Sequence, residues 1–224
     1  DSAESIWVVG YGKFGHRAVD QLLHDSHAPA QFTVIDAMFQ GNVQEGIQDG
    51  VDYVHADGVR WLVENFHRQG EVRWVIPALP VHLAAQWIKG KLVGNGKAVE
   101  ALPIPAEIVQ LLPNAYHLSD AEYAVSHADF ICPPDCREPD EICTHTGTPR
   151  PQPLHDLLHS LPAANTKILI IRSHQLAPGV GGLDAKELWR LLERVQDFEG
   201  TPLLLGTACR CHGIVTSFRF ESRE

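Results

Sequence analysis

Five cysteines are the residues of this sequence best suited to bind a metal, and Cys132, Cys136 and Cys143 lie within 12 residues of one another. Thiolates bind zinc and hold iron–sulfur clusters. The prolines of this segment limit the chain entropy that is lost when ligands converge. Intervals of three and six residues between successive cysteines match neither paired C-x-x-C zinc sites nor a ferredoxin run. We therefore expect a cysteine-ligated metal centre, zinc or iron–sulfur, and the spacing does not decide between them.

A fourth metal ligand must come from elsewhere in the chain. We favour Cys211, with Cys209 as the nearest alternative, because Cys209-Arg210-Cys211-His212 follows an expected strand whose end projects side chains across a loop. His212 and His145 are further alternatives. The competing interpretation is a set of buried or disulfide-bonded cysteines without a metal, since free cysteine is commonly buried as a small apolar residue.

A glycine-rich turn forms a second candidate site. Four apolar residues, 6–9, lead directly into Gly10-Tyr11-Gly12-Lys13-Phe14-Gly15, a G-x-G-x-x-G pattern. In such a turn Gly10 permits the sharp bend, Gly12 lets the backbone approach a pyrophosphate, and Gly15 allows close packing of the next helix. The amino end of that helix presents free N–H groups to phosphate. The pattern predicts a nucleotide site and names no reaction.

The next expected strand supplies a carboxylate for this site. Asp36 ends the apolar run 32–36 and lies 21 residues beyond Gly15, close to the position of the acid that binds an adenosine ribose. An acid at this position also repels a 2′-phosphate, so we expect NAD(H) rather than NADP(H). AMP, ADP and ATP are the alternative ligands.

Two histidines are weaker candidates. His174 follows an expected strand and precedes the glycine-rich segment Gly179–Gly182, read as a turn. It could act as a general acid or base at a strand end, although a plain loop histidine is the simpler interpretation. His82 follows the fourth expected strand near the cofactor crevice.

Alternating strands and helices predict how these residues are positioned. Apolar runs at 6–9, 32–36, 51–55 and 72–76 are typical of strands, and amphipathic patterns at 13–24, after Asp57 and at 81–88 are typical of helices. This alternation predicts a Rossmann-like, mainly parallel sheet with helices on both faces. We expect a dinucleotide-binding domain at 1–97 and a cysteine-containing α/β region at 98–224 that extends the same sheet or forms another.

The second half should contain further regular elements around one long loop. Residues 129–153 are dense in proline, cysteine and aspartate and predict an irregular but ordered loop. The remaining patterns predict helices at 104–112, 154–161 and 185–195, the last capped by Asp184, and strands at 167–172, 201–207 and 214–220.

Residues 5–97 resemble the NAD-binding (TrkA-N) domain of the regulator-of-potassium-conductance family. The matching features are Val-Val-Gly-Tyr-Gly-Lys-Phe-Gly, the Val-Ile-Asp36 strand end, Val-His-Ala-Asp57 before a helix, and a strand reaching Ile76-Pro77-Ala78. The resemblance implies that residues 10–15 wrap the phosphates, that Asp36 holds a ribose and that Asp57 lies beside the adenosine half. It also implies a homodimer.

Composition limits the classes of partner. The 224 residues carry a formal charge of −10 and no stripe of lysine and arginine, which argues against nucleic acid and an anionic membrane surface. No run approaches the roughly 18–20 apolar residues needed to cross a bilayer. We therefore expect a cytoplasmic protein without direct membrane insertion.

These patterns lead to one principal functional hypothesis: an NAD(H)-binding redox or nucleotide-responsive regulatory or accessory protein with a cysteine-ligated metal centre. One alternative is an NAD-dependent oxidoreductase that uses a zinc or iron–sulfur centre. The other is a structural interaction module with a structural metal.

Overall fold

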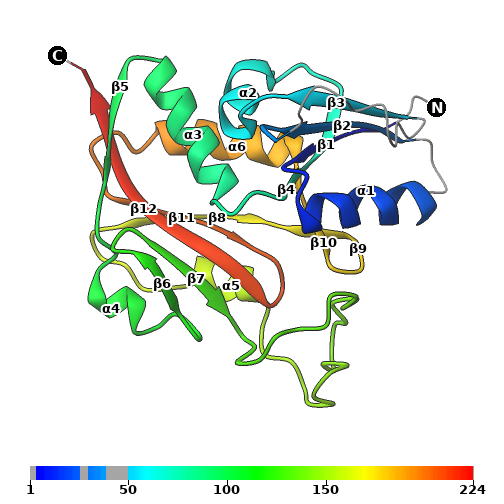
Figure 1. The fold of residues 1–224 in the computed structure, drawn as a ribbon. Coiled ribbons are helices and arrows are strands. Elements are labelled where there is room, and N and C mark those ends of the chain that lie inside the picture. The colour runs from blue at the N-terminus through cyan, green and yellow to red at the C-terminus, as the bar shows by residue number, and fades with distance from the viewer. Residues whose placement is uncertain (1–3, 26–29, 39–49, 224) are drawn as a thin grey trace.

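The structure is a computed structural model that describes residues 4–25, 30–38 and 50–223. Those residues form two mixed β-sheets and six helices, a mixed α/β fold (Figure 1). The helices are α1 Lys13–Asp25, α2 Gly58–Asn65, α3 Leu83–Gly94, α4 Ala106–Val109, α5 Leu154–His159 and α6 Ala185–Gln196. Within the described ranges, no helix has the length and apolar character required to cross a membrane.

The first sheet combines strands from both halves of the chain in the order β3-β2-β1-β4-β10-β9. These strands are β1 Glu4–Val9, β2 Ala30–Asp36, β3 Val51–His55, β4 Val72–Pro77, β9 His174–Ala177 and β10 Val180–Asp184. The first four pair in parallel, whereas β10 runs antiparallel to β4 and to β9. The sheet is therefore mixed, and the expectation of a mainly parallel sheet holds only for β1–β4.

The glycine-rich segment after His174 is part of a hairpin and not simply a turn. Gly181 and Gly182 lie in β10, where an added Cβ would come 2.5 Å from the Ser173 hydroxyl and 2.5 Å from a Leu176 methyl, respectively. The glycines thus allow close approach between neighbouring strands. Asp184 ends β10, and its carboxylate accepts hydrogen bonds from the N–H groups of Lys186 and Glu187, which confirms the predicted cap of α6.

The second sheet is mostly antiparallel and has the order β6-β7-β12-β11-β8. Its strands are β6 Tyr116–Ser119, β7 Glu122–Ser126, β8 Lys167–Arg172, β11 Leu203–Ala208 and β12 His212–Ser222, and β5 Lys97–Ala101 pairs with the far end of β12. Only β8 and β11 pair in parallel among the described pairings of this sheet. The sequence analysis missed β5, β6 and β7.

The helices separate the two sheets and cover their outer faces (Figure 1). Helix α1 packs on one face of the first sheet through a core that includes Val8 and Val19. Helices α2, α3 and α6 lie between the sheets, in a continuous core that runs from Val9 through Trp87 and Leu188 to Phe218. Helices α4 and α5 cover the outer face of the second sheet. One core therefore joins the glycine turn and the second sheet.

Candidate functional site

The glycine turn joins β1 to α1 and has the geometry that its three glycines suggest. Gly10 has a φ of +104°, and a Cβ there would lie 2.6 Å from the carbonyl oxygen of Ala78. A Cβ on Gly15 would lie 2.1 Å from the Gly10 carbonyl oxygen, whereas a Cβ on Gly12 would meet no atom within 4 Å. The first and third glycines are thus required by packing, and the second leaves open space at the start of α1.

Asp36 lies beside this turn at the end of β2. One of its carboxylate oxygens accepts a hydrogen bond of 2.6 Å from the Tyr11 N–H, and the other accepts one of 2.6 Å from the Met38 N–H. Each oxygen has a second lone pair that can accept from a ligand hydroxyl. The structure therefore brings Asp36 and the turn together.

Asp57 has a structural role at the start of α2. It is the N-cap, and its side chain accepts a hydrogen bond of 2.8 Å from the Arg60 N–H. Such a cap stabilises a helix by about 1 kcal/mol, so the position of this acid is explained without a ligand.

An aromatic group covers the β3 side of the turn. The ring of Tyr11 stacks on His16 with centroids 3.7 Å apart, and its hydroxyl lies 3.3 Å from that of Tyr53. Burial, followed by the hydrogen bond with Tyr53, raises the pKa of Tyr11 well above its usual value. Tyr11 therefore remains a neutral phenol.

All five cysteines line a single cavity of about 1030 Å³, together with His212. Each cysteine is half-buried and none forms a disulfide. Cys136, Cys211 and Cys143 are also close enough to Cys132 that their charges raise its pKa, although burial is the larger cause. The fold thus gathers the four cysteines that the sequence analysis proposed as ligands, although they span positions 132–211.

Three of the sulfurs accept hydrogen bonds from backbone N–H groups. Cys209 Sγ accepts from the N–H groups of Cys211 and His212, at 3.4 and 3.3 Å. Cys136 Sγ accepts from Glu138 at 3.4 Å. At Cys143 the Thr146 hydroxyl, followed by the N–H groups of Thr146 and His145, lowers the thiol pKa. Such donors favour thiolate sulfur, the form that binds metals.

Like Cys132, Cys209 and Cys211 lie in surroundings that favour the neutral thiol. Burial raises the pKa of Cys209 to about 11, and the charge of Glu138 adds to this effect. Burial also raises the pKa of Cys211, opposed by the Arg150 guanidinium, whose Nη2 donates to Cys211 Sγ. In the absence of a metal, Arg150 is therefore the main positive partner of Cys211.

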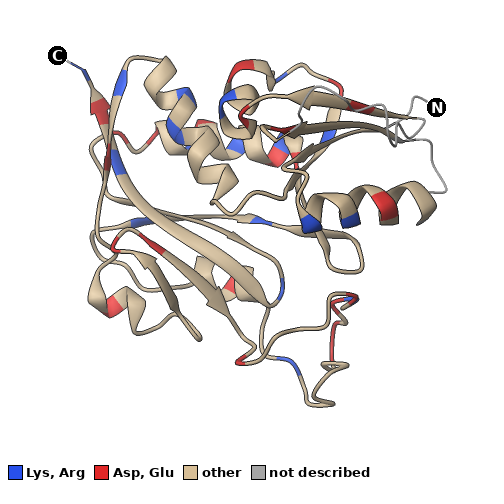
Figure 2. Ribbon diagram, in the orientation of Figure 1, with Lys and Arg blue, Asp and Glu red and all other residues tan. Residues whose placement is uncertain are grey.

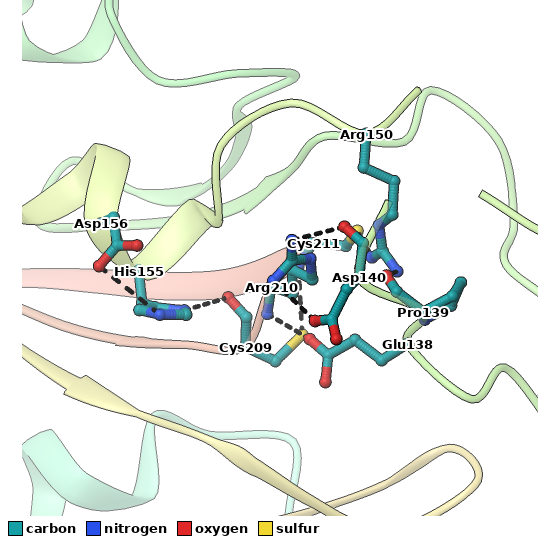
Figure 3. Close-up of polar contacts among 9 residues, drawn as sticks. All are labelled: Glu138, Pro139, Asp140, Arg150, His155, Asp156, Cys209, Arg210 and Cys211. Carbon is teal, nitrogen blue, oxygen red and sulfur yellow. Dashed lines mark hydrogen bonds and ion pairs between the residues drawn. The ribbon is translucent and has the colours of Figure 1, made fainter. Parts of the chain in front are cut away.

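The loop that carries Cys132, Cys136 and Cys143 is fixed by three arginines, of which Arg17 and Arg210 come from distant segments and Arg150 from the loop itself. Arg17 of α1 donates to the carbonyl oxygen of Pro134 at 3.0 Å, and Arg150 donates to that of Pro139 at 2.5 Å. Arg210 donates to the carbonyl oxygen of Asp140 at 2.6 Å, and its backbone N–H bonds the Glu138 carboxylate (Figure 3). The predicted loop is irregular and ordered, with these contacts supplying the order.

The β9–β10 hairpin contacts the same loop. Gln175 Nε2 and the Gly179 N–H both donate to the carbonyl oxygen of Cys136, at 2.7 and 3.1 Å. A Cβ on Gly179, where φ is +70°, would lie 2.0 Å from the Pro134 carbonyl oxygen. The hairpin therefore connects the cysteine loop to the first sheet.

Part of the cavity wall belongs to the helix that follows the glycine turn. Lys13, Phe14 and Arg17 line it, and each lies in the first two turns of α1. Figure 2 shows that the end of α1 nearest the loop carries basic residues. Of the predicted nucleotide-site residues, Lys13 and Phe14 line this cavity, so the two candidate sites are adjacent, a relation that the sequence did not predict.

The cavity does not yet have the geometry of a metal site. Among residues 4–25, 30–38 and 50–223, no three histidine, cysteine, aspartate or glutamate side chains form a cluster compact enough to hold a metal ion. The donor chemistry suits zinc or iron–sulfur, but the sulfurs would have to converge, and Arg150 would have to release Cys211.

The other histidine candidates lie in different surroundings. The ring of His145 stacks on Phe130 with centroids 4.5 Å apart and is absent from the cavity wall. His174 pairs with Glu187 at 3.2 Å. His82 is 1% exposed, and both of its ring nitrogens bond threonine hydroxyls of the second sheet. His82 thus lies in the core and not in an open crevice.

Sequence reasoning missed Arg17, Arg150 and Arg210. Their partners are 117, 61 and 70 residues away along the chain, and local spacing carries no signal for such contacts. Only the unusual density of proline and cysteine in residues 129–153 indicated that this loop needed anchoring.

Comparison with known proteins identifies relatives without an assigned activity. A protein of Archaeoglobus fulgidus, described as an uncharacterized protein, is 26% identical over 237 residues, covering 95% of this chain and 98% of that protein. No solved structure matches.

The family comparison also corrects the sequence analysis. It gives no match to the regulator-of-potassium-conductance (TrkA-N) family or to another Rossmann family, so the proposed resemblance is wrong, and the expected homodimer loses its basis. The match that is found covers residues 84–221, more than half of the chain, including all five cysteines and excluding the glycine turn. The chain therefore belongs to the family described as "Uncharacterized protein, C-terminal domain".

Proposed function

We propose that this protein binds NAD(H) at the glycine turn and holds a cysteine-ligated metal centre beside it, acting as a redox or nucleotide-responsive regulatory or accessory protein. One observation carries the proposal. All five cysteines line a cavity whose wall also includes Lys13, Phe14 and Arg17, at the start of the helix that follows the glycine turn. A ligand at the turn and a metal at the cysteines would therefore influence each other directly.

The strand order and the turn support dinucleotide binding. Parallel strands in the order β3-β2-β1-β4 match one half of a doubly wound dinucleotide-binding sheet. Space beside Gly12 would allow a pyrophosphate to approach the first N–H groups of α1, and the dipole of that helix favours an anion. Asp36 retains lone pairs for a ribose hydroxyl and would repel a 2′-phosphate, which favours NAD(H) over NADP(H).

The donor set supports a metal centre held by Cys132, Cys136, Cys143 and Cys211. The charges of the other three reach Cys132, and N–H groups already point at Cys136 and Cys143. Cys209 is the alternative to Cys211, because two N–H groups point at its sulfur. Zinc there would stabilise the loop, whereas an iron–sulfur cluster would supply a one-electron centre.

The cavity itself favours a second candidate, an NAD-dependent oxidoreductase. Its volume of about 1030 Å³ is comparable with that of small-molecule sites, roughly 300–1,000 Å³. A substrate could therefore occupy the space between the turn and the cysteines. Oxidation of NADH in the presence of candidate electron acceptors would distinguish this enzyme from a regulatory protein.

The metal half is tested by elemental and acid-labile sulfide analysis of protein purified without oxygen. We expect stoichiometric zinc, or iron with matching sulfide, and loss of the metal in Cys132→Ser. Cys211→Ser and Cys209→Ser form a matched pair in which only the variant that removes a ligand loses metal. Protein that contains no metal and binds no added zinc would contradict this half of the proposal.

The nucleotide half is tested by calorimetric titration with NADH, NAD and ADP. Gly12→Val is a suitable variant, because the open space at Gly12 accepts a side chain without a clash in the fold. We expect NADH to bind the wild type and to bind this variant at least about tenfold more weakly. Failure of the wild type to bind any of the three nucleotides would reject this half.

A further inference from the structure

We propose that the cysteine cavity receives the nicotinamide half of the bound dinucleotide, with the ring between Phe14 and the cysteine loop. This inference rests on the proposed function and specifies the orientation of its ligand. It assigns the Phe14 side chain, the cavity face of β10 and the cysteine loop to one ligand site.

The position of Asp36 sets the direction of the ligand. Asp36 ends β2, which lies between β1 and β3, so an adenosine ribose bound to this acid places the adenosine half on the β3 side of the turn. The pyrophosphate lies at the start of α1. The second half of the dinucleotide must then extend past α1 toward β4, the neighbour of β1 on its other side.

The cavity lies on that side of the turn. Strand β10 runs antiparallel to β4, with Leu183 opposite Val75, so β10 begins beside the carboxyl end of β4. Its first residues, Val180 and Gly181, line the cavity together with Phe14. Open α/β sheets bind ligands in the crevice outside the carboxyl ends of their strands, and here Phe14 and the start of β10 place the cysteine cavity beside that crevice.

The surfaces of the cavity suit an uncharged or singly charged aromatic ring that carries an amide. Phe14 is 64% exposed and Ile131 is 96% exposed, and both line the cavity. Aromatic rings pack favourably on such surfaces. Ser173 and Gln175 also line the cavity and offer donors and acceptors for the carboxamide. Lys13, at the same rim, offers a cation to the pyrophosphate.

The inference is tested by comparing NADH with ADP-ribose, which contains the adenosine, the pyrophosphate and the second ribose but lacks the nicotinamide ring. In Phe14→Ala we expect NADH to bind about 3- to 10-fold more weakly, with ADP-ribose affinity unchanged. Val93→Ala is the matched control, since Val93 is also exposed and apolar but lies in α3 away from the cavity. It should change neither affinity.

Fluorescence of NADH gives a second readout on the protein as purified. A ring enclosed against Phe14 and Ile131 should emit more strongly and at shorter wavelength than in water, and Phe14→Ala should reduce this change. Equal weakening of NADH and ADP-ribose, or no weakening of either, would overturn the inference while the proposed function stands. If neither ligand binds the wild type, the proposed function itself fails, and this inference with it.

Discussion

His82 should make folding stability sensitive to mild acid. Its ring lies between Thr216 and Thr207, whose hydroxyl oxygens are 2.7 and 2.9 Å from Nδ1 and Nε2, and Thr216 donates in turn to Glu122 at 2.7 Å. The network ties the start of α3 to β11 and β12. Complete burial, with a smaller contribution from the charge of Lys89, lowers the pKa of His82 from 6.5 to about 3.

The sign and size of the effect follow from this shift. Because the unfolded chain binds a proton more readily than the folded one, the contribution of neutral His82 is complete above pH 6.5 and is lost as pH falls toward 3. At about pH 5, which is about 1.5 units below the unfolded-state pKa of the histidine, protonation of the unfolded chain lowers the free energy of unfolding by about 2 kcal/mol relative to neutral pH. The charged groups linked to this ring are Lys89, whose charge acts on it, and Glu122, which it reaches through Thr216.

Urea unfolding at about pH 7.5 and about pH 5 would measure this difference. His82→Gln retains a hydrogen-bonding group but does not titrate, so the fall in unfolding free energy should be about 2 kcal/mol smaller than in the wild type. Burial also lowers the pKa of His127 and of His212, and comparing the two proteins cancels their contributions. An equal pH dependence in both proteins would refute the role assigned to His82.

Substitutions at four further positions test the turn, the helix cap and the ribose contact. Gly15→Ala should lower the unfolding free energy by about 1–3 kcal/mol through overpacking, whereas Gly12→Ala should change it by less than about 0.5 kcal/mol; equal effects in urea unfolding would contradict this. Asp184→Ala should cost about 1–2 kcal/mol with Asp184→Asn recovering most of it, measured by thermal unfolding. Asp36→Ala should weaken NADH about tenfold and reduce discrimination against NADPH, measured by calorimetry; unchanged preference would contradict the ribose contact.

The sequence predicted the first four strands and α6 because local patterns determine them. The run at 6–9 becomes β1, in which Val8 and Val9 are fully buried against cores on opposite faces of the sheet. Asp184 caps α6 through its own side chain. Such signals are contained within a few neighbouring residues, so they predict an element without knowledge of its distant contacts.

Strands whose formation depends on distant partners were missed. All four residues of β6 are exposed, so the strand buries neither face and is defined by its pairing with β7. In β10, Gly181 and Gly182 indicate a turn by residue type, but Ser173 and Leu176 fill the space where their side chains would be. Antiparallel pairing to β4 then makes the first sheet mixed.

The sequence predicted which residues could form the candidate site, but it did not predict how the fold brings them together. Clustering of Cys132, Cys136 and Cys143 indicated shared chemistry, and the fold does place them around one cavity with Cys211. The contact between α1 and the cysteine loop depends on Arg17, which lies 117 residues from its partner. The family resemblance failed because a glycine turn between a strand and a helix is a local solution that unrelated α/β proteins share.

The most direct test of a shared dinucleotide and metal cavity is the absorption of the cobalt(II)-loaded protein during titration with NADH. Several thiolates on one cobalt ion give a strong sulfur-to-metal charge-transfer band, because soft sulfur ligands donate readily to the metal. We predict that this band forms in the wild type and changes with saturation as NADH fills the cavity. Absence of the band, or a band unchanged by saturating NADH, would contradict the shared cavity.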